Sequence, residues 1–159
     1  ELKQHEYLHR QNSDPARPLT EQLIKDVGDN GSVLVWYEGF EKARNSELGD
    51  MFPEFKEAME ALNGRVVDLM IRFKQKWYDD PRFNGSASIK QVLPVLCPEL
   101  SYKELGIQEG GSAQRLWMEA ILDEKRADEK EKILSDLIEY CKLDTLAMAE
   151  IYKRLRLLL

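Results

Sequence analysis

Asp144 lies on a helix face that is otherwise apolar, so it is the first residue to consider for chemistry. Helical spacing places Tyr140 one turn before it on the same face. A carboxylate taken out of water is costly unless it is protonated, hydrogen-bonded, paired or bound to a metal. A phenol four residues away can position a water molecule beside such a ligand. The remaining members of this face are Ala147, Met148, Ile151 and Leu155.

Glu41 is the second candidate acid, because it follows a β-branched and aromatic run, Ser32 to Tyr37, by four residues. Open α/β sheets place their functional sites at the carboxyl ends of strands. The plainer interpretation is a solvated carboxylate at a helix start. If Glu41 and Asp144 converge, their repulsion is relieved by a shared proton or a divalent cation. Oxygen ligands of this kind favour Mg²⁺ or Mn²⁺ over zinc.

Lys90 and Asp68 each allow two interpretations. Lys90 lies in the opening turn of a predicted helix, where it could contact a phosphate together with backbone N–H groups. Alternatively Ser88 caps that helix and Lys90 is solvated. Asp68 is placed as the cap of a following helix rather than as a metal ligand.

The bulk composition predicts a single domain over residues 1–159. The chain has 159 residues, of which 43% are hydrophobic. A net charge of -6 excludes a global basic field, so any nucleic-acid contact is local or bridged by cations. Exposed aromatic side chains could still stack on single-stranded bases, although packing is the simpler role. The aromatic residues in question are Trp77, Tyr78 and Trp117.

The same composition predicts a cytoplasmic protein without a membrane partner. No stretch reaches the roughly 18 apolar residues of a membrane span, and the start lacks a signal-peptide pattern. Cys97 and Cys141 have no metal-type spacing and are expected to be buried, reduced thiols.

The hydrophobic pattern predicts a few strands and many helices, which is typical of an α/β domain with a small or incomplete sheet. Extended segments are expected at 2–8, 32–37 and 66–67. Helices are expected at 20–27, 40–51, 55–62, 69–77, from Ile89 to Pro94, after Gly110, at 127–140 and at 141–158. The last two are either separate helices or one long or kinked helix.

The candidate residues lie in motifs that resemble those of two protein families. A strand followed by Phe40-Glu41, then by Val66 to Leu69 and finally by Tyr140 to Asp144, resembles the later motifs of ribonuclease H-like, DEDD-type 3′-to-5′ exonucleases. More closely, three strings resemble a bacterial family known as domain of unknown function 2779, over nearly the whole chain. These strings are Trp36–Glu41, Gly85–Pro94 and Tyr140–Met148.

The exonuclease resemblance implies a ribonuclease H-like α/β fold and hydrolysis of phosphodiester bonds in DNA or RNA. In such enzymes two metal ions roughly 4 Å apart activate water and stabilise the leaving oxygen. By this resemblance Glu41 and Asp144 are metal ligands for Mg²⁺ or Mn²⁺, and Tyr140 orients the attacking water. Single-stranded nucleic acid is the implied partner.

The opening Asp-x-Glu motif of these exonucleases is absent from the sequence, which predicts an incomplete metal site. The segment before Leu8 is similar to a later strand of such folds, so we expect a fragment of a longer protein whose opening strands lie upstream. Such a fragment should bind metal weakly and hydrolyse little. A second departure from the family pattern is Glu38, because the family more often has a small or amide residue at that position. The alternative function is a non-catalytic binding or regulatory module that acts with other domains of a larger bacterial protein.

Overall fold

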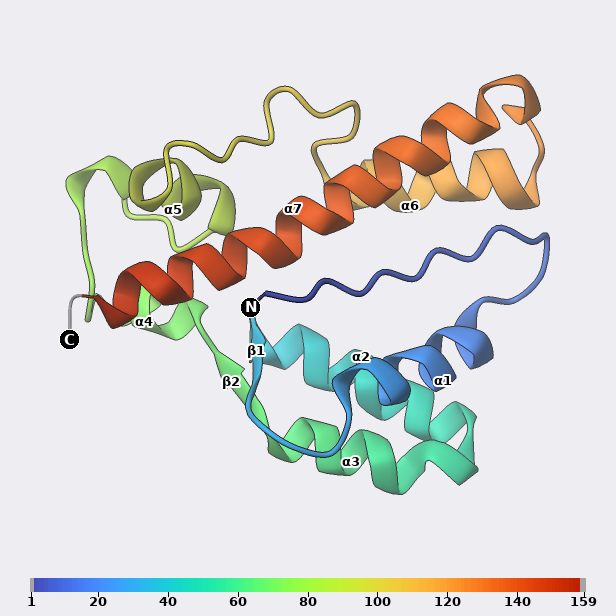
Figure 1. Ribbon diagram of the computed structural model, residues 1–159, viewed down its shortest axis with the longest axis horizontal. Helices are drawn as coiled ribbons and strands as arrows, with labels where there is room; N and C mark the ends of the chain where they lie inside the picture. Colours follow the sequence, from blue (N-terminus) through green and yellow to red (C-terminus); the bar gives the residue numbers. More distant parts are fainter. Residues whose placement is uncertain (1, 158–159) are drawn as a thin grey trace.

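One long helix, α7 (Lys130–Arg156), crosses the whole molecule (Figure 1). The structure is a computed structural model that describes residues 2–157. α6 (Gly110–Trp117) lies beside the amino-terminal half of α7, and α5 (Ile89–Leu96) lies beside its carboxyl-terminal half. The two predicted closing segments are one helix, because no glycine or proline interrupts 130–156. Leu158, the predicted end, lies outside the described residues.

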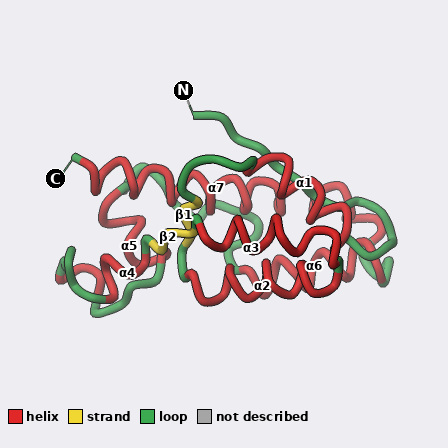
Figure 2. Tube along the Cα trace, turned by 90° about the horizontal axis from the view of Figure 1, so that it is seen from below, coloured by secondary structure: helices red, strands yellow, loops and turns green. Residues whose placement is uncertain are grey.

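The sheet consists of two short parallel strands within the described residues, β1 (Val33–Val35) and β2 (Val66–Asp68). Leu34 is opposite Val67 in the register. The connection runs through α2 (Glu38–Met51), a 3-10 turn (Pro53–Phe55) and α3 (Lys56–Gly64). In Figure 2 the strands lie between the α4 and α5 region and the helices α1, α2 and α3. The molecule is therefore a helix-rich α/β structure with a small sheet.

Several helices differ from their predicted bounds, and the largest difference is that α1 (Ala16–Val27) begins four residues before the predicted start at residue 20. α4 (Met70–Lys74) ends before Trp77, because Lys76 adopts a φ of 56° that no helix continues. α5 continues through Pro94 to Leu96, so the predicted end at Pro94 is wrong; the tertiary packing of the fully buried Val92 and Leu93 outweighs the one backbone hydrogen bond that Pro94 cannot donate. The remaining elements are 3-10 turns at Pro81–Phe83 and Ala127–Glu129, and a π-helical turn at Met118–Leu122.

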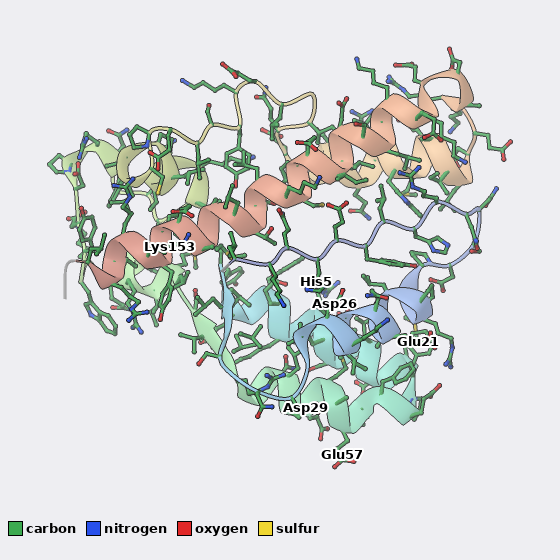
Figure 3. The ribbon with its side chains drawn as sticks, viewed as in Figure 1. His5, Glu21, Asp26, Asp29, Glu57 and Lys153 are labelled. Carbon is green, nitrogen blue, oxygen red and sulfur yellow. The ribbon has the colours of Figure 1, made fainter. Side chains whose placement is uncertain are left out.

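The amino-terminal segment, residues 2–10, is extended and runs between α7 and α1 (Figure 1). The predicted strand at 2–8 is wrong, because among the described residues no strand pairs with it. Its polar side chains instead anchor it to helices. Gln4 Nε2 donates to the Lys142 carbonyl at 3.3 Å, and His5 Nδ1 lies 3.3 Å from the carboxylate of Asp26 on α1 (Figure 3). Gln4 and His5, the polar residues that break the apolar–polar alternation expected of a strand at 2–8, are thus the ones that fix the segment.

Two apolar clusters form the core, and Tyr140 packs against both. The first contains Phe73, Phe83, Val92, Leu93, Cys97, Tyr102, Ala147 and Ile151. The second contains Ile107, Ala120, Ile121, Ile133, Leu134 and Leu137.

The two cysteines differ in exposure. Cys97 is buried as predicted, whereas Cys141 is exposed, so its predicted burial is wrong; it lies at the edge of the apolar face of α7, beside the extended amino-terminal segment. Among the described residues, no helix combines the length and the apolar character that a membrane crossing requires.

Candidate functional site: a carboxylate beside two phenols

Asp144 is half-buried on α7, and its carboxylate is hydrogen-bonded. The Tyr102 hydroxyl donates to Asp144 Oδ1 at 2.6 Å, a short bond of the kind formed with an ionised acceptor. The neighbouring residues of this face, Ala147 and Ile151, are fully buried. The hydrogen bond from Tyr102 therefore explains how Asp144 is tolerated on the apolar face of α7. Hydrogen bonding is one of the four possibilities that the sequence left for this carboxylate.

Tyr102 is the residue of this site that sequence reasoning missed. It lies in an irregular loop between α5 and α6, where no helical or strand periodicity marks it, yet only 7% of it is exposed. Its ring centre is 6.2 Å from that of Tyr140. The one available signal was an aromatic residue in an otherwise polar loop sequence, Ser101 to Glu104.

Both phenols stay protonated at neutral pH and can act as hydrogen-bond donors. Burial, followed by the hydrogen bond to Asp144, raises the pKa of Tyr102. Burial and the charge of Asp144 also raise the pKa of Tyr140. A Cβ added at Gly110 would lie 3.7 Å from the Tyr140 hydroxyl, so this hydroxyl lies close to the start of α6. One carboxylate and two neutral phenols thus form a compact polar group inside the apolar core.

Lys90 reaches the same group from α5. Its Nζ lies 6.0 Å from the centre of the Tyr102 ring, within the range of a weak cation–π contact. Lys90 is half-buried, and among the described residues no carboxylate forms an ion pair with it. Ser88 is the residue that precedes the helix, but its side chain makes no capping bond. The structure therefore places Lys90, Tyr102, Tyr140 and Asp144 in one neighbourhood.

Trp36 connects the sheet to this neighbourhood. Its indole N–H donates to the Ala87 carbonyl at 3.1 Å, and its ring stacks on Phe73 with centroids 5.4 Å apart. Trp36, Ala87 and Tyr140 all pack against the first apolar cluster. The three strings singled out in the sequence, which are Trp36–Glu41, Gly85–Pro94 and Tyr140–Met148, therefore contribute to a common core.

Asp68 is a capping residue in the structure. Its carboxylate accepts backbone hydrogen bonds from Tyr37 and Glu38 at 3.1 Å each, and from Met70 at 2.8 Å. These contacts join the end of β2 to the start of α2 and satisfy N–H groups that a helix start leaves unpaired. The cap predicted for the following helix is present as the bond from Met70, and Asp68 also caps α2. Glu38 forms an ion pair with Lys42 at 2.7 Å.

Glu41 lies in the first turn of α2, just after β1, as the sequence predicted. It is half-buried, and burial raises the pKa of its carboxyl group. Within residues 2–157 no hydrogen bond or ion pair joins Glu41 to Asp144. Glu41 is therefore placed at the expected strand end but is not brought into contact with the phenol-held acid.

A divalent cation does not fit the described residues by themselves. Mg²⁺ prefers octahedral oxygen coordination and Ca²⁺ takes still more ligands. Residues 2–157 contain no group of three or more His, Cys, Asp or Glu side chains that could hold a metal ion. The shared site of Glu41 and Asp144 stays a prediction, and any such site needs further ligands.

Comparison with known proteins gives a family and one distant relative. The chain is 28% identical over 146 residues to an uncharacterized protein, MG366, of Mycoplasma genitalium. This match covers 85% of the chain but only 22% of that longer protein. No solved structure matches the chain. Residues 1–88 match the family described as Domain of unknown function (DUF2779), and since this is more than half of the chain, the chain belongs to that family.

Proposed function

We propose that this chain is part of a divalent-metal-dependent 3′-to-5′ nuclease of ribonuclease H-like fold that acts on DNA or RNA. Asp144 and Glu41 are its candidate acidic ligands for Mg²⁺ or Mn²⁺, and Tyr140 orients water. Lys90 contacts a substrate phosphate. The further ligands that such a site needs are supplied by other parts of a longer protein, and this chain alone is nearly inactive.

The observation that most supports the proposal is the meeting of three segments that are distant in the sequence. Trp36 bonds to the Ala87 carbonyl, while Lys90 and Tyr102 connect that segment to Asp144. A half-buried lysine without a carboxylate partner among the described residues is suited to an anionic ligand. A protonated Tyr140 beside a carboxylate is suited to holding a water molecule in place.

The chain's own residues would prepare this site rather than complete it. Tyr102 fixes the orientation of Asp144 through one short hydrogen bond. The apolar cluster below excludes water from the inner side of the carboxylate. Lys90 remains available to an anion.

A second candidate is a non-catalytic binding or regulatory module. It is favoured by the absence of a three-ligand group among residues 2–157 and by the use of an Asp144 oxygen for the bond from Tyr102. In this case the Tyr102–Asp144 pair only stabilises the core.

The test is degradation of 5′-labelled single-stranded DNA and RNA by the full-length protein with and without Mn²⁺. We expect Mn²⁺-dependent shortening from the 3′ end and a loss of about 100-fold or more in rate for Asp144→Asn. Glu139→Gln, an exposed acid-to-amide change on the same helix, is the matched control and should keep the wild-type rate.

Two results would reject the nuclease. One is a full-length protein that degrades neither substrate with Mn²⁺, and the other is an Asp144→Asn variant with wild-type activity. A melting temperature that Mn²⁺ does not change, together with no hydrolysis, would favour the binding module.

A further inference from the structure

A second surface, away from Asp144, has the composition of a binding site. It is a concave groove of about 630 Å³ between the two-stranded sheet, α4 and the carboxyl-terminal end of α7, where Figure 3 labels Lys153. We call it the arginine groove. Its defining residues are Leu34, Val67, Arg72, Trp77, Tyr152 and Arg156.

The floor of the arginine groove is aliphatic. Leu34 and Val67 are paired across the parallel strands, so their side chains lie on the same face of the sheet. Both remain half-buried, and Leu155 of α7 extends the apolar surface. One face of the sheet is therefore left partly open to solvent, which is uncommon for parallel strands because helices usually cover both faces.

Aromatic residues form the walls of the groove. Trp77 is 66% exposed and Tyr152 is 37% exposed, although both are large and apolar. Arg72 covers the Trp77 ring with its guanidinium carbon 4.8 Å from the ring centre, and Arg156 lies 5.9 Å from that of Tyr152. Tryptophan, tyrosine and arginine are the residues that most often dominate binding energy at protein interfaces.

The two arginines differ from the others in the chain. Eight of the ten arginines have an ion pair or donate to a carbonyl. Within residues 2–157, Arg72 and Arg156 have neither, and both line the same groove. No acidic side chain lines it. In a chain with a net charge of -6, these two guanidinium groups around one apolar surface therefore have no anionic partner among residues 2–157.

These features select the chemistry of the occupant. A guanidinium forms paired hydrogen bonds with a carboxylate, and an aliphatic floor takes aliphatic side chains. Single-stranded nucleic acid would need base stacking on open aromatic faces and a broadly basic surface. Arg72 and Arg156 already lie over the exposed Trp77 and Tyr152 rings. The aliphatic floor offers no stacking, and the overall charge is negative.

We infer that the arginine groove binds an acidic, amphipathic peptide segment of a partner protein. The aliphatic side chains of the segment contact the Leu34–Val67 floor, and its carboxylates pair with Arg72 and Arg156. This inference does not depend on the proposed nuclease, because the groove shares none of the residues assigned to the Asp144 site.

A displayed library of random 16-residue peptides tests the inference, with selection on the immobilised full-length protein. We expect the enriched peptides to carry net negative charge and aliphatic residues. Their affinity should fall tenfold or more on the double variant Arg72→Ala/Arg156→Ala. The control variant Arg44→Ala/Arg115→Ala removes two exposed helix arginines elsewhere and should bind normally.

Charge reversal keeps the test decisive if the alanine variant folds poorly. Arg72→Glu/Arg156→Glu, checked for folding by circular dichroism, should reject acidic peptides and select basic ones. The inference is overturned by enrichment of neutral or basic peptides, by equal binding to the alanine variant, or by tighter binding of a 16-nucleotide dT oligomer. It is also overturned if acidic peptides bind the isolated chain but not the full-length protein, because the occupant would then belong to the same polypeptide.

Discussion

The surroundings of Asp144 and Glu41 differ more than their sequence contexts suggest. Both acids are half-buried and both follow apolar segments. Asp144 receives a short hydrogen bond from Tyr102 and lies beside Tyr140, whereas burial alone raises the pKa of Glu41. Asp68 lies at the end of the strand paired with β1 and accepts three backbone N–H bonds. Partial burial alone therefore does not reveal the role of an acidic residue. The groups that donate hydrogen bonds to its carboxylate must also be known.

The largest effect in this comparison is expected for the capping acid. Asp68→Ala leaves the N–H groups of Tyr37, Glu38 and Met70 without their acceptor. We expect the free energy of unfolding to fall by about 2 kcal/mol, as measured by urea denaturation. Asp68→Asn retains an acceptor oxygen and should lose less. Equal stability of wild type and Asp68→Ala would show that the cap is not formed.

The next effect is expected at the phenol-held acid. Tyr102→Phe removes the donor to Asp144 and leaves its carboxylate partly buried without that bond. The expected cost is about 1–2 kcal/mol of unfolding free energy. A double-mutant cycle with Asp144→Ala, which removes the acceptor, isolates the pair, and we expect a coupling energy of about 1 kcal/mol. Additive effects of the two substitutions would contradict a direct Tyr102–Asp144 bond.

A smaller effect of opposite sign is expected at Glu41. Because burial raises the folded-state pKa of Glu41 above 4.5, the folded state holds its proton more tightly than the unfolded state does. Ionised Glu41 therefore reduces stability as pH rises through this range. Glu41→Gln should raise the unfolding free energy at pH 7 by less than about 1 kcal/mol, discounted for its partial exposure.

The pH dependence checks the sign at Glu41. Denaturation of wild type and Glu41→Gln should give equal stabilities well below pH 4.5, with a gain for the variant that appears as the pH rises. A variant less stable than wild type at pH 7 would mean that the Glu41 carboxylate has a stabilising partner.

A destabilising effect of similar size to that of Glu41→Gln is expected at Gly106. A Cβ there would lie 2.5 Å from the Asp136 carboxylate oxygen, so the loop that carries Tyr102 approaches α7 closely. Since Asp136 can rotate, Gly106→Ala should cost only about 0.5–1 kcal/mol. The double variant Gly106→Ala/Asp136→Ala should recover the wild-type melting temperature, and no recovery would place the cause elsewhere.

Local patterns in the sequence predicted much of the fold. The β-branched run gives β1, and the apolar face through Asp144 gives one buried side of α7. The strand expected at 2–8 is not formed, because its pairing depends on a neighbouring strand rather than on its own residues. Tyr102 reaches Asp144 from an irregular loop, a contact between distant residues that no periodicity encodes. The arginine groove likewise joins residues of the sheet, α4 and α7 that are far apart in the chain.

We propose that Asp144, Tyr140, Lys90 and Glu41 form one site for a cation-bridged anion. Paramagnetic broadening of backbone amide signals by low concentrations of Mn²⁺ can detect weak binding to such a site in the isolated chain. We expect the amides around 41, 90, 102 and 144 to broaden together, and Asp144→Asn to abolish this effect. Broadening confined to the exposed acidic residues between 123 and 131 would show that Mn²⁺ binds elsewhere and that the four residues do not form a cation site.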